Sequence, residues 1–221
     1  MRKLILDTET TGLDYENDRI IEVACLELFD DVITGNTFHK YYNPGEIIIS
    51  DQAEQIHGLS NSFLRKFEKF DDQVDDLIDF IADSFLIIHN AQFDISMLNS
   101  SFKRSGKPII KDSRTICTLE MAKKKFPGSK NNLNALCRRF NISLEDRVKH
   151  GALTDCRLLS EVYIELLGGR QEKLLFSQKE KIENHLSDTR AKELEYDLVD
   201  LSEKELNDHT KILKKLSNPI W

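Results

Sequence analysis

The sequence predicts an α/β fold in which a mixed sheet, built from an antiparallel hairpin and parallel strands, is flanked by helices. Lys3–Asp7 and Phe85–Ile88 are short aliphatic runs, typical of strands that are buried on both faces. Ile20–Phe29 and Ile33–Tyr42 are longer, partly alternating runs divided by Asp30-Asp31, which favours an antiparallel hairpin. Helical patterns separate and follow these runs, as in a sheet with helices packed against it.

The helical spacing of apolar residues is clearest over Asp72–Asp83, where Val74, Leu77, Ile78 and Ile81 share one face. The remaining elements follow from caps, glycines and prolines. The first of these is a helical stretch over Asp51–Leu59 after Ser50, with Ser60 as a further cap. A helix over Gln92–Ser105 and a weaker strand within Ile109–Cys117 follow, and a helix then runs from a cap at Thr118 to Lys125. The last elements are a helix over Asn131–Phe140, a loop over Arg147–Gly151, and a helix over Ala152–Leu167 that ends at Gly168-Gly169.

The chain divides by composition into a body of residues 1–169 and a tail of residues 170–221. Its 221 residues are enough for one sizeable domain with an appendage. The tail has no glycine and one proline, and Ser202-Glu203-Lys204-Glu205 has the pattern of a helix capping box. Because the tail is too short to bury its apolar faces alone, we expect a helical or flexible segment that docks on the body or binds a partner.

The overall composition indicates a soluble protein, with 40% hydrophobic and 31% charged residues. No apolar run reaches transmembrane length and no signal pattern opens the chain, so we expect a cytoplasmic protein without a membrane partner. Four scattered cysteines form no Cys-x-x-Cys pair, which argues against disulfides and zinc. The net charge is −7, yet Phe102–Lys149 holds 13 Lys and Arg against 4 Asp and Glu. That region is either a phosphate-contacting surface or an ordinary solvated one.

Two acidic residues mark the end of the first strand. Asp7 and Glu9 are two positions apart, so in an extended chain their side chains project to the same side. Carboxylates held that close repel unless they are protonated or bridged by a cation, and hard divalent cations prefer such oxygen ligands. Gly12 then allows the backbone to turn sharply and approach a ligand. The alternative is a strand that runs into a solvated acidic loop.

Three further residues fit the same centre. Asp94 follows the strand Phe85–Ile88 at the start of a helix, Asp155 lies near the start of the last body helix, and His150 precedes it in a loop. The ends of neighbouring parallel strands meet at one edge of a sheet. Four carboxylates and an imidazole suit phosphodiester hydrolysis with two Mg²⁺ or Mn²⁺ ions, in which the histidine takes a proton from water. Individually, each acid is equally well explained as a helix cap, and the histidine as a surface residue.

A set of motifs runs through the body in a characteristic order and spacing. These motifs are Asp7-Thr8-Glu9-Thr10-Thr11-Gly12-Leu13, Ile56-His57-Gly58, His89-Asn90-Ala91-Gln92-Phe93-Asp94, Phe126-Pro127-Gly128, Asn132-Leu133-Asn134-Ala135-Leu136-Cys137, His150-Gly151-Ala152-Leu153-Thr154-Asp155 and Gly168-Gly169. Taken together, they are similar to the motifs of the DEDDh 3′–5′ exonucleases, and most closely to those of the epsilon (proofreading) subunits of bacterial DNA polymerase III. The similarity covers about Lys3–Gly169.

The resemblance implies a ribonuclease-H-like sheet and the removal of one nucleotide at a time from a 3′ end. It assigns the two metal ions to Asp7, Glu9, Asp94 and Asp155, and the role of general base to His150. Asp7, Glu9 and Asp155 then also count as substrate contacts. The other substrate contacts that it implies are Gly12, Leu13, Gln52, His57, Asn90 and Phe93.

Some of these assignments carry alternatives. Gln52 stands where the family often has a glutamate, and an amide can still hydrogen-bond a sugar hydroxyl. Leu13 would pack against the terminal base. Phe93 and Asn90 would line the same pocket, unless Phe93 is a core residue and Asn90 a loop cap.

A short segment after the body is similar to the peptides by which polymerase subunits bind the sliding clamp. It carries Gln171, Leu174, Leu175 and Phe176, whose apolar side chains would fill a preformed pocket. A helix extension packed on the body is the alternative. The resemblance further implies the DNA 3′ end, the polymerase alpha subunit and a small theta-like subunit as partners. An exoribonuclease of the same fold, or a non-catalytic scaffold between polymerase and clamp, remains as an alternative function.

Overall fold

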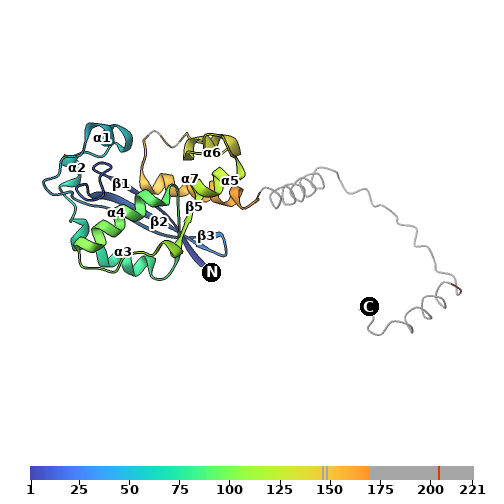
Figure 1. The fold of residues 1–221 in the computed structure, drawn as a ribbon, viewed down its shortest axis with the longest axis horizontal. Coiled ribbons are helices and arrows are strands. Elements are labelled where there is room, and N and C mark those ends of the chain that lie inside the picture. The colour runs from blue at the N-terminus through green and yellow to red at the C-terminus, as the bar shows by residue number, and fades with distance from the viewer. Residues whose placement is uncertain (146, 148, 170–203, 205–221) are drawn as a thin grey trace, which may run out of the picture. The chain divides into compact units, whose positions relative to one another are not determined.

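The structure, a computed structural model, describes residues 1–145, 147, 149–169 and 204 (Figure 1). In these residues, five strands form one sheet in the order β3-β2-β1-β4-β5. β1 pairs antiparallel with β2 and parallel with β4, which confirms the predicted mixed sheet. The strands are β1 (Arg2–Thr10), β2 (Ile20–Phe29), β3 (Val32–Tyr41), β4 (Phe85–Ile88) and β5 (Thr115–Cys117).

Helices connect and cover the strands. They are α1 (Asp51–His57), α2 (Asn61–Leu64), α3 (Val74–Ile81), α4 (Ala91–Arg104), α5 (Thr118–Lys125), α6 (Leu133–Phe140) and α7 (Ala152–Leu166), with short 3₁₀ turns η1 (Phe70–Asp72) and η2 (Asp112–Arg114). Ser50 caps α1 and Ser60 caps α2 through their side chains, as the sequence predicts.

The alternation of side chains along the central strand builds a core on each face of the sheet. Leu4 and Leu6 of β1 pack in one core with residues of α3 and α4, whereas Ile5 packs in the other with residues of α5, α6 and α7. All three residues are fully buried. The aliphatic run therefore serves two helix layers, which lie on either side of the sheet in Figure 1.

The parallel pairing of β1 and β4 determines where acidic residues gather. Leu4 lies beside Leu86 and Ile5 beside Ile87, so both strands run toward the same edge of the sheet. The chain turns at Asn90, which has a φ of 65°, and α4 begins directly afterwards. This short turn brings the first residues of α4 next to the last residues of β1.

The weaker strand predicted within Ile109–Cys117 is confirmed as β5, which covers its last three residues. The backbone of Ile110, nearer the start of that range, hydrogen-bonds both polar atoms of the Asn99 side chain. Two local predictions are wrong. β1 continues to Thr10, so Asp7 and Glu9 lie within the strand because pairing with β2 extends to the end of the acidic motif. Thr118 is not the cap of α5, because its hydroxyl donates to the carbonyl of Ile88 at 3.3 Å.

The tail predicted over residues 170–221 lies outside the described residues, apart from Lys204. The clamp-binding prediction for Gln171, Leu174, Leu175 and Phe176 therefore also lies outside them. Within the described part of the chain, no helix is both long and apolar enough to cross a membrane.

Candidate active site

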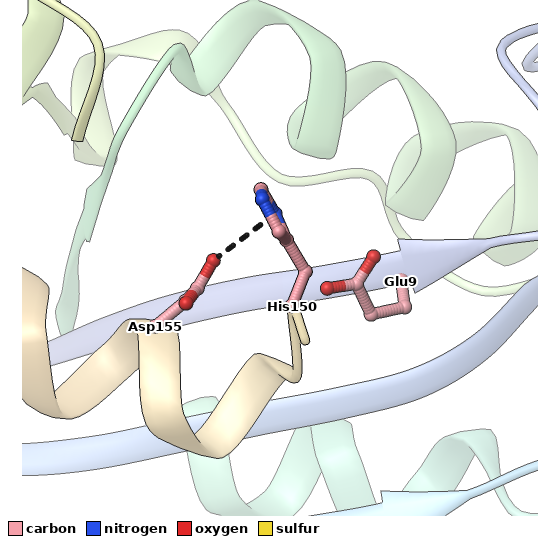
Figure 2. A group of neighbouring side chains, drawn as sticks. All are labelled: Glu9, His150 and Asp155. Carbon is pink, nitrogen blue, oxygen red and sulfur yellow. Dashed lines mark ion pairs between the residues drawn. The ribbon is translucent and has the colours of Figure 1, made fainter. Parts of the chain in front are cut away.

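Three predicted residues from separate elements meet at the carboxyl edge of β1. Glu9 lies on β1, Asp155 in the first turn of α7, and His150 in the loop before that helix (Figure 2). Each offers a ligand atom within 4.8 Å of the others. The His150 ring and the Asp155 carboxylate are 3.6 Å apart, and His150 remains 43% exposed at its side chain. The imidazole is thus accessible to water while it faces a buried acid.

Asp94 comes to the same edge from the start of α4. Its Oδ1 accepts hydrogen bonds from the hydroxyl of Thr8 at 2.7 Å and from the backbone N–H of Thr8 at 3.2 Å. Burial nevertheless raises the pKa of Asp94 to about 7, against the opposing effect of these hydrogen bonds. Two hydrogen bonds therefore tie Asp94 of α4 to β1, at the strand edge where it was expected if the two strands were neighbours.

The remaining carboxylates are held in a similarly unfavourable setting. Burial, followed by the charges of Asp94, Glu9 and Asp155, raises the pKa of Asp7 well above its usual range. The pKa of Glu9 rises to about 8, first through burial and then through the carboxylate of Glu22, its cross-strand partner. These carboxyl groups resist ionisation because they are buried and lie close to one another.

The donor set fits hard divalent cations, which prefer several oxygen ligands and would remove this repulsion. Asp7, Glu9, Asp94 and Asp155 supply oxygens from two strand positions and two helix starts. A histidine nitrogen lies beside them. We conclude that the residues present suit a metal centre of the predicted kind.

A buried arginine that the sequence analysis did not single out lies inside this centre. Arg147 donates from Nε to Asp155 Oδ1 at 2.6 Å and from Nη2 to Asp155 Oδ2 at 2.5 Å. It also donates to Asn134 Oδ1 at 2.6 Å and to His150 Nδ1 at 3.0 Å. In the sequence, only its position three residues before His150 could have indicated a role for Arg147. The spacing of residues does not show which acidic side chain an arginine in a loop will pair with.

The loop that carries His150 is anchored to α1 by two hydrogen bonds. The backbone N–H of His150 donates to the carbonyl of Ile56 at 3.1 Å, and Lys149 Nζ donates to the carbonyl of Gln55 at 2.6 Å. Burial and the charge of Arg147 lower the pKa of His150, while Asp155 opposes this effect. The loop thus joins the acidic centre to the helix that carries two predicted substrate contacts.

A cavity of about 560 Å³ adjoins the centre and is lined by several of the predicted substrate contacts. Leu13 lies on its rim with its side chain 82% exposed, and Phe93 contributes to the wall while also packing against the core. Asn90 is exposed at the start of α4 and lines neither this cavity nor the smaller one described below. The predicted contacts lining the cavity are Glu9, Gly12, Leu13, Gln52, His57 and Phe93.

His57 brings a hydrogen-bond donor to this cavity. Its Nδ1 accepts from the backbone N–H of Leu59 at 3.0 Å, so the ring proton lies on Nε2. Nε2 is buried without a well-formed hydrogen bond among the described residues. Burial lowers the pKa of His57, while the charge of Glu22 and a contact with the Thr10 backbone oppose this effect. Since buried donors are nearly always paired, a ligand oxygen in the cavity would complete the pairing of Nε2. The exposed side chains of Ile48 and Ile56 add an apolar rim that the sequence analysis did not identify.

A smaller cavity of about 270 Å³ lies on the α6 side of the centre. Asp7, Asp155, His150 and Arg147 line it together with His89. Burial lowers the pKa of His89 to about 4, so its imidazole is neutral at physiological pH. Asp7 and Asp155 therefore line the smaller cavity and Glu9 lines the larger one, so the acidic centre borders both.

Comparison with known proteins agrees with this arrangement. The exonuclease family model RNase_T matches residues 4–163. DNA polymerase III subunit epsilon of Rickettsia conorii is 47% identical over 191 residues, covering 85% of this chain and 83% of the relative. The same subunit of Salmonella typhimurium is 39% identical over 178 residues, covering 76% of this chain and 72% of the relative.

Solved structures show the same fold. Exonuclease X, in complex with 5′ overhanging duplex DNA, superimposes with a TM-score of 0.56 at 25% identity and covers 75% of this chain and 91% of its own. The nuclease domain of 3′hExo, a DEDDh family member bound to rAMP, gives a TM-score of 0.65 at 18% identity and covers 76% of this chain and 92% of its own.

Proposed function

This chain belongs to the RNase_T exonuclease family, and we propose that it is the 3′–5′ exonuclease that proofreads for a bacterial DNA polymerase III. The observation that carries this proposal is the gathering of Glu9, Asp155 and His150 at one strand edge in a chain that is similar to epsilon subunits over 85% of its length. The substrate would be the 3′ end of DNA, and the product a 5′-mononucleotide.

The metal ions of this reaction would be held by Asp7, Glu9, Asp94 and Asp155. The raised pKa values of Asp7, Glu9 and Asp94 support this assignment, because bound cations would stabilise the ionised carboxylates. When bound, two Mg²⁺ or Mn²⁺ ions would supply charge stabilisation to the attacking and leaving oxygens.

His150 would take the proton from the attacking water. The water oxygen forms a bond to the last phosphorus of the strand, and the bond from that phosphorus to the preceding 3′ oxygen breaks. The exposure of His150 beside Asp155 supports this role, because a base must reach both solvent and the acidic centre. The proton moves to an imidazole nitrogen, and the leaving 3′ oxygen is protonated from solvent.

The larger cavity would hold the terminal nucleotide. His57 Nε2 would donate to its sugar or phosphate oxygens, and Gln52 would hydrogen-bond a sugar hydroxyl. Leu13 and Phe93 would contact the terminal base, with Gly12 allowing close approach of the backbone. A side chain at Gly12 would collide with Asp18, which supports the need for glycine there. Asn90 stays a proposed contact at the edge of the site.

The partners would be those of a replicative polymerase. Gln171, Leu174, Leu175 and Phe176 would bind the sliding clamp, and the rest of the tail, residues 170–221, would bind the polymerase alpha subunit. Residues 1–169 would form the exonuclease domain, and a small theta-like subunit is a further candidate partner. A protein with these partners would work in the cytoplasm.

The test is nucleotide release from 5′-labelled single-stranded DNA and RNA of one sequence, with Mg²⁺ and with chelator. We expect a ladder that shortens from the 3′ end of DNA only when metal is present, with RNA much slower. Faster RNA degradation would establish the exoribonuclease alternative. If the folded protein degrades neither substrate, the non-catalytic scaffold between polymerase and clamp would be the supported function.

A further inference from the structure

The arginine in the acidic centre occupies the carboxylate that a metal ion would need. Both oxygens of Asp155 accept charge-assisted hydrogen bonds from Arg147, at 2.6 and 2.5 Å. The side chains of Arg147 and Asp155 are only 5% and 6% exposed. This is a well-formed bidentate ion pair, and it lies among four carboxylates that otherwise repel one another.

A divalent ion and this guanidinium compete for the same position. An Mg²⁺ ion on Asp155 would lie about 2 Å from an oxygen that already receives an N–H group. The two positive charges would then be at most roughly 5 Å apart between side chains that are nearly buried, where repulsion is strong. Although each carboxylate oxygen has a second lone pair, this repulsion favours movement of Arg147 away from Asp155 when an ion binds there.

The surroundings of Arg147 allow its side chain to move while the loop stays in place. Lys149 and the backbone of His150 fix the loop to α1. Asn134 on α6 accepts a third hydrogen bond from the guanidinium at 2.6 Å, so Arg147 keeps a half-buried partner after it leaves Asp155. The guanidinium also lines the smaller cavity, which provides space beside the acids.

The same movement would release His150. Because a guanidinium can only donate, the contact from Arg147 Nη2 holds His150 Nδ1 as an acceptor. Arg147 therefore hydrogen-bonds both a proposed metal ligand, Asp155, and the proposed base, His150. This is the arrangement expected of a resting site.

We propose that Arg147 is a placeholder cation, which neutralises Asp155 in the metal-free protein and is displaced when a divalent ion binds there. The proposal rests on the function proposed above. It makes Arg147 a positioning residue that weakens metal binding and stabilises the metal-free fold. The opposite possibility is that Arg147 orients Asp155 for the metal and thereby strengthens binding.

Manganese binding without nucleic acid separates these possibilities. Free Mn²⁺ would be counted by electron paramagnetic resonance during titration of the full chain and of three variants, Arg147→Gln, Arg147→Lys and Arg138→Gln. Arg138 is exposed on the same helix as Asn134, so its substitution makes the same charge change away from the site.

We expect Arg147→Gln to bind Mn²⁺ about 10- to 100-fold more tightly, because a charge-assisted competitor has been removed. Arg147→Lys should fall between this variant and the unmodified protein, since an ammonium keeps the charge but cannot bridge two oxygens as a planar fork does. Arg138→Gln should bind as the unmodified protein does. Equal or weaker Mn²⁺ binding by Arg147→Gln would overturn the proposal.

Thermal melting gives a second readout. In chelator, the Arg147→Gln variant should melt roughly 5–10 °C below the unmodified protein, because loss of the guanidinium leaves the buried carboxylate of Asp155 unpaired. Saturating Mn²⁺ should close this gap. A gap that persists would mean that the arginine is purely structural, and the proposal would fail. If Arg147→Gln does not fold in chelator, the Mn²⁺ affinity of Arg147→Lys tests the proposal instead. Binding by Arg147→Lys that is no tighter than binding by the unmodified protein would then overturn the proposal.

Because these measurements contain no nucleic acid, they test the placeholder role of Arg147 separately from the proposed exonuclease activity. An unmodified protein that binds Mn²⁺ as expected but degrades no DNA would contradict the exonuclease and leave the placeholder intact. An active exonuclease whose Arg147→Gln variant shows no gain in Mn²⁺ affinity would contradict only the placeholder.

Discussion

Replacing Glu9 with glutamine should stabilise the metal-free protein, although it should also abolish hydrolysis. The pKa of Glu9 rises from an ordinary value of 4.5 to about 8, through burial and the carboxylates of Glu22, Asp155 and Asp94. Below pH 4 the folded and unfolded chains both hold the proton. Between about pH 4.5 and 8 the unfolded chain loses it while the folded chain keeps it, so stability falls until the full penalty is present above pH 8.

The penalty can be bounded from this shift. Each pKa unit corresponds to about 1.4 kcal/mol, which gives an upper limit of roughly 4–5 kcal/mol above pH 8. Glu9 is partly exposed, and solvent screening lowers the effect. We expect Glu9→Gln to gain about 1–3 kcal/mol, or roughly 3–10 °C in melting temperature for a chain of this length.

The assay is thermal melting in chelator at pH 5 and at pH 8. Glu9→Gln should gain stability at pH 8 and little at pH 5, because the amide removes a titrating group. Glu161→Gln is the matched control, since Glu161 is exposed on α7. An equal gain at both pH values, or none at pH 8, would refute the reasoning that the acidic centre costs stability when it lacks metal.

Three further predictions concern the site and the tail. Asp7→Ala should abolish measurable hydrolysis without lowering the melting temperature in chelator, because it removes a proposed metal ligand and relieves repulsion; full activity would contradict the site assignment. His150→Ala should slow hydrolysis by about 10²–10⁴-fold while Mn²⁺ binding persists, and an unchanged rate and pH profile would exclude His150 as the base. Replacing Leu174, Leu175 and Phe176 together with alanine should weaken clamp capture in a pull-down but leave hydrolysis of short single strands intact; undiminished capture would contradict the docking proposal.

The sequence could predict the parts of this molecule that depend on local pattern. The aliphatic runs around Leu4–Leu6 and Phe85–Ile88 predicted neighbouring buried strands, and their pairing brings Asp94 beside Thr8. The hairpin of β2 and β3 followed from two apolar runs with acidic residues between them. Such elements are predictable because each residue's face is set by a period of 2 or 3.6.

What the sequence could not predict depends on contacts between distant residues. The place of the weak strand within Ile109–Cys117 is one example, because Asn99 binds the backbone of Ile110 and only Thr115–Cys117 forms a strand, which no local propensity indicates. The pairing of Arg147 with Asp155 likewise depends on how a loop returns over α7. A sequence pattern identifies candidate metal ligands. The basic side chain that pairs with one of them is identified only in the folded structure.

The acidic centre also bears on whether this protein could be a scaffold. Asp94 and Asp155 lie in the first turns of α4 and α7, where the helix dipole favours a negative charge. Thr8 donates two hydrogen bonds to Asp94, and Arg147 neutralises Asp155, yet the pKa values of Asp7 and Glu9 remain raised. The fold therefore supports these acids locally without removing their repulsion. A protein that only bridged two partners would gain stability from neutral residues here, whereas in a metal-dependent nuclease bound cations would attract these carboxylates and relieve their repulsion.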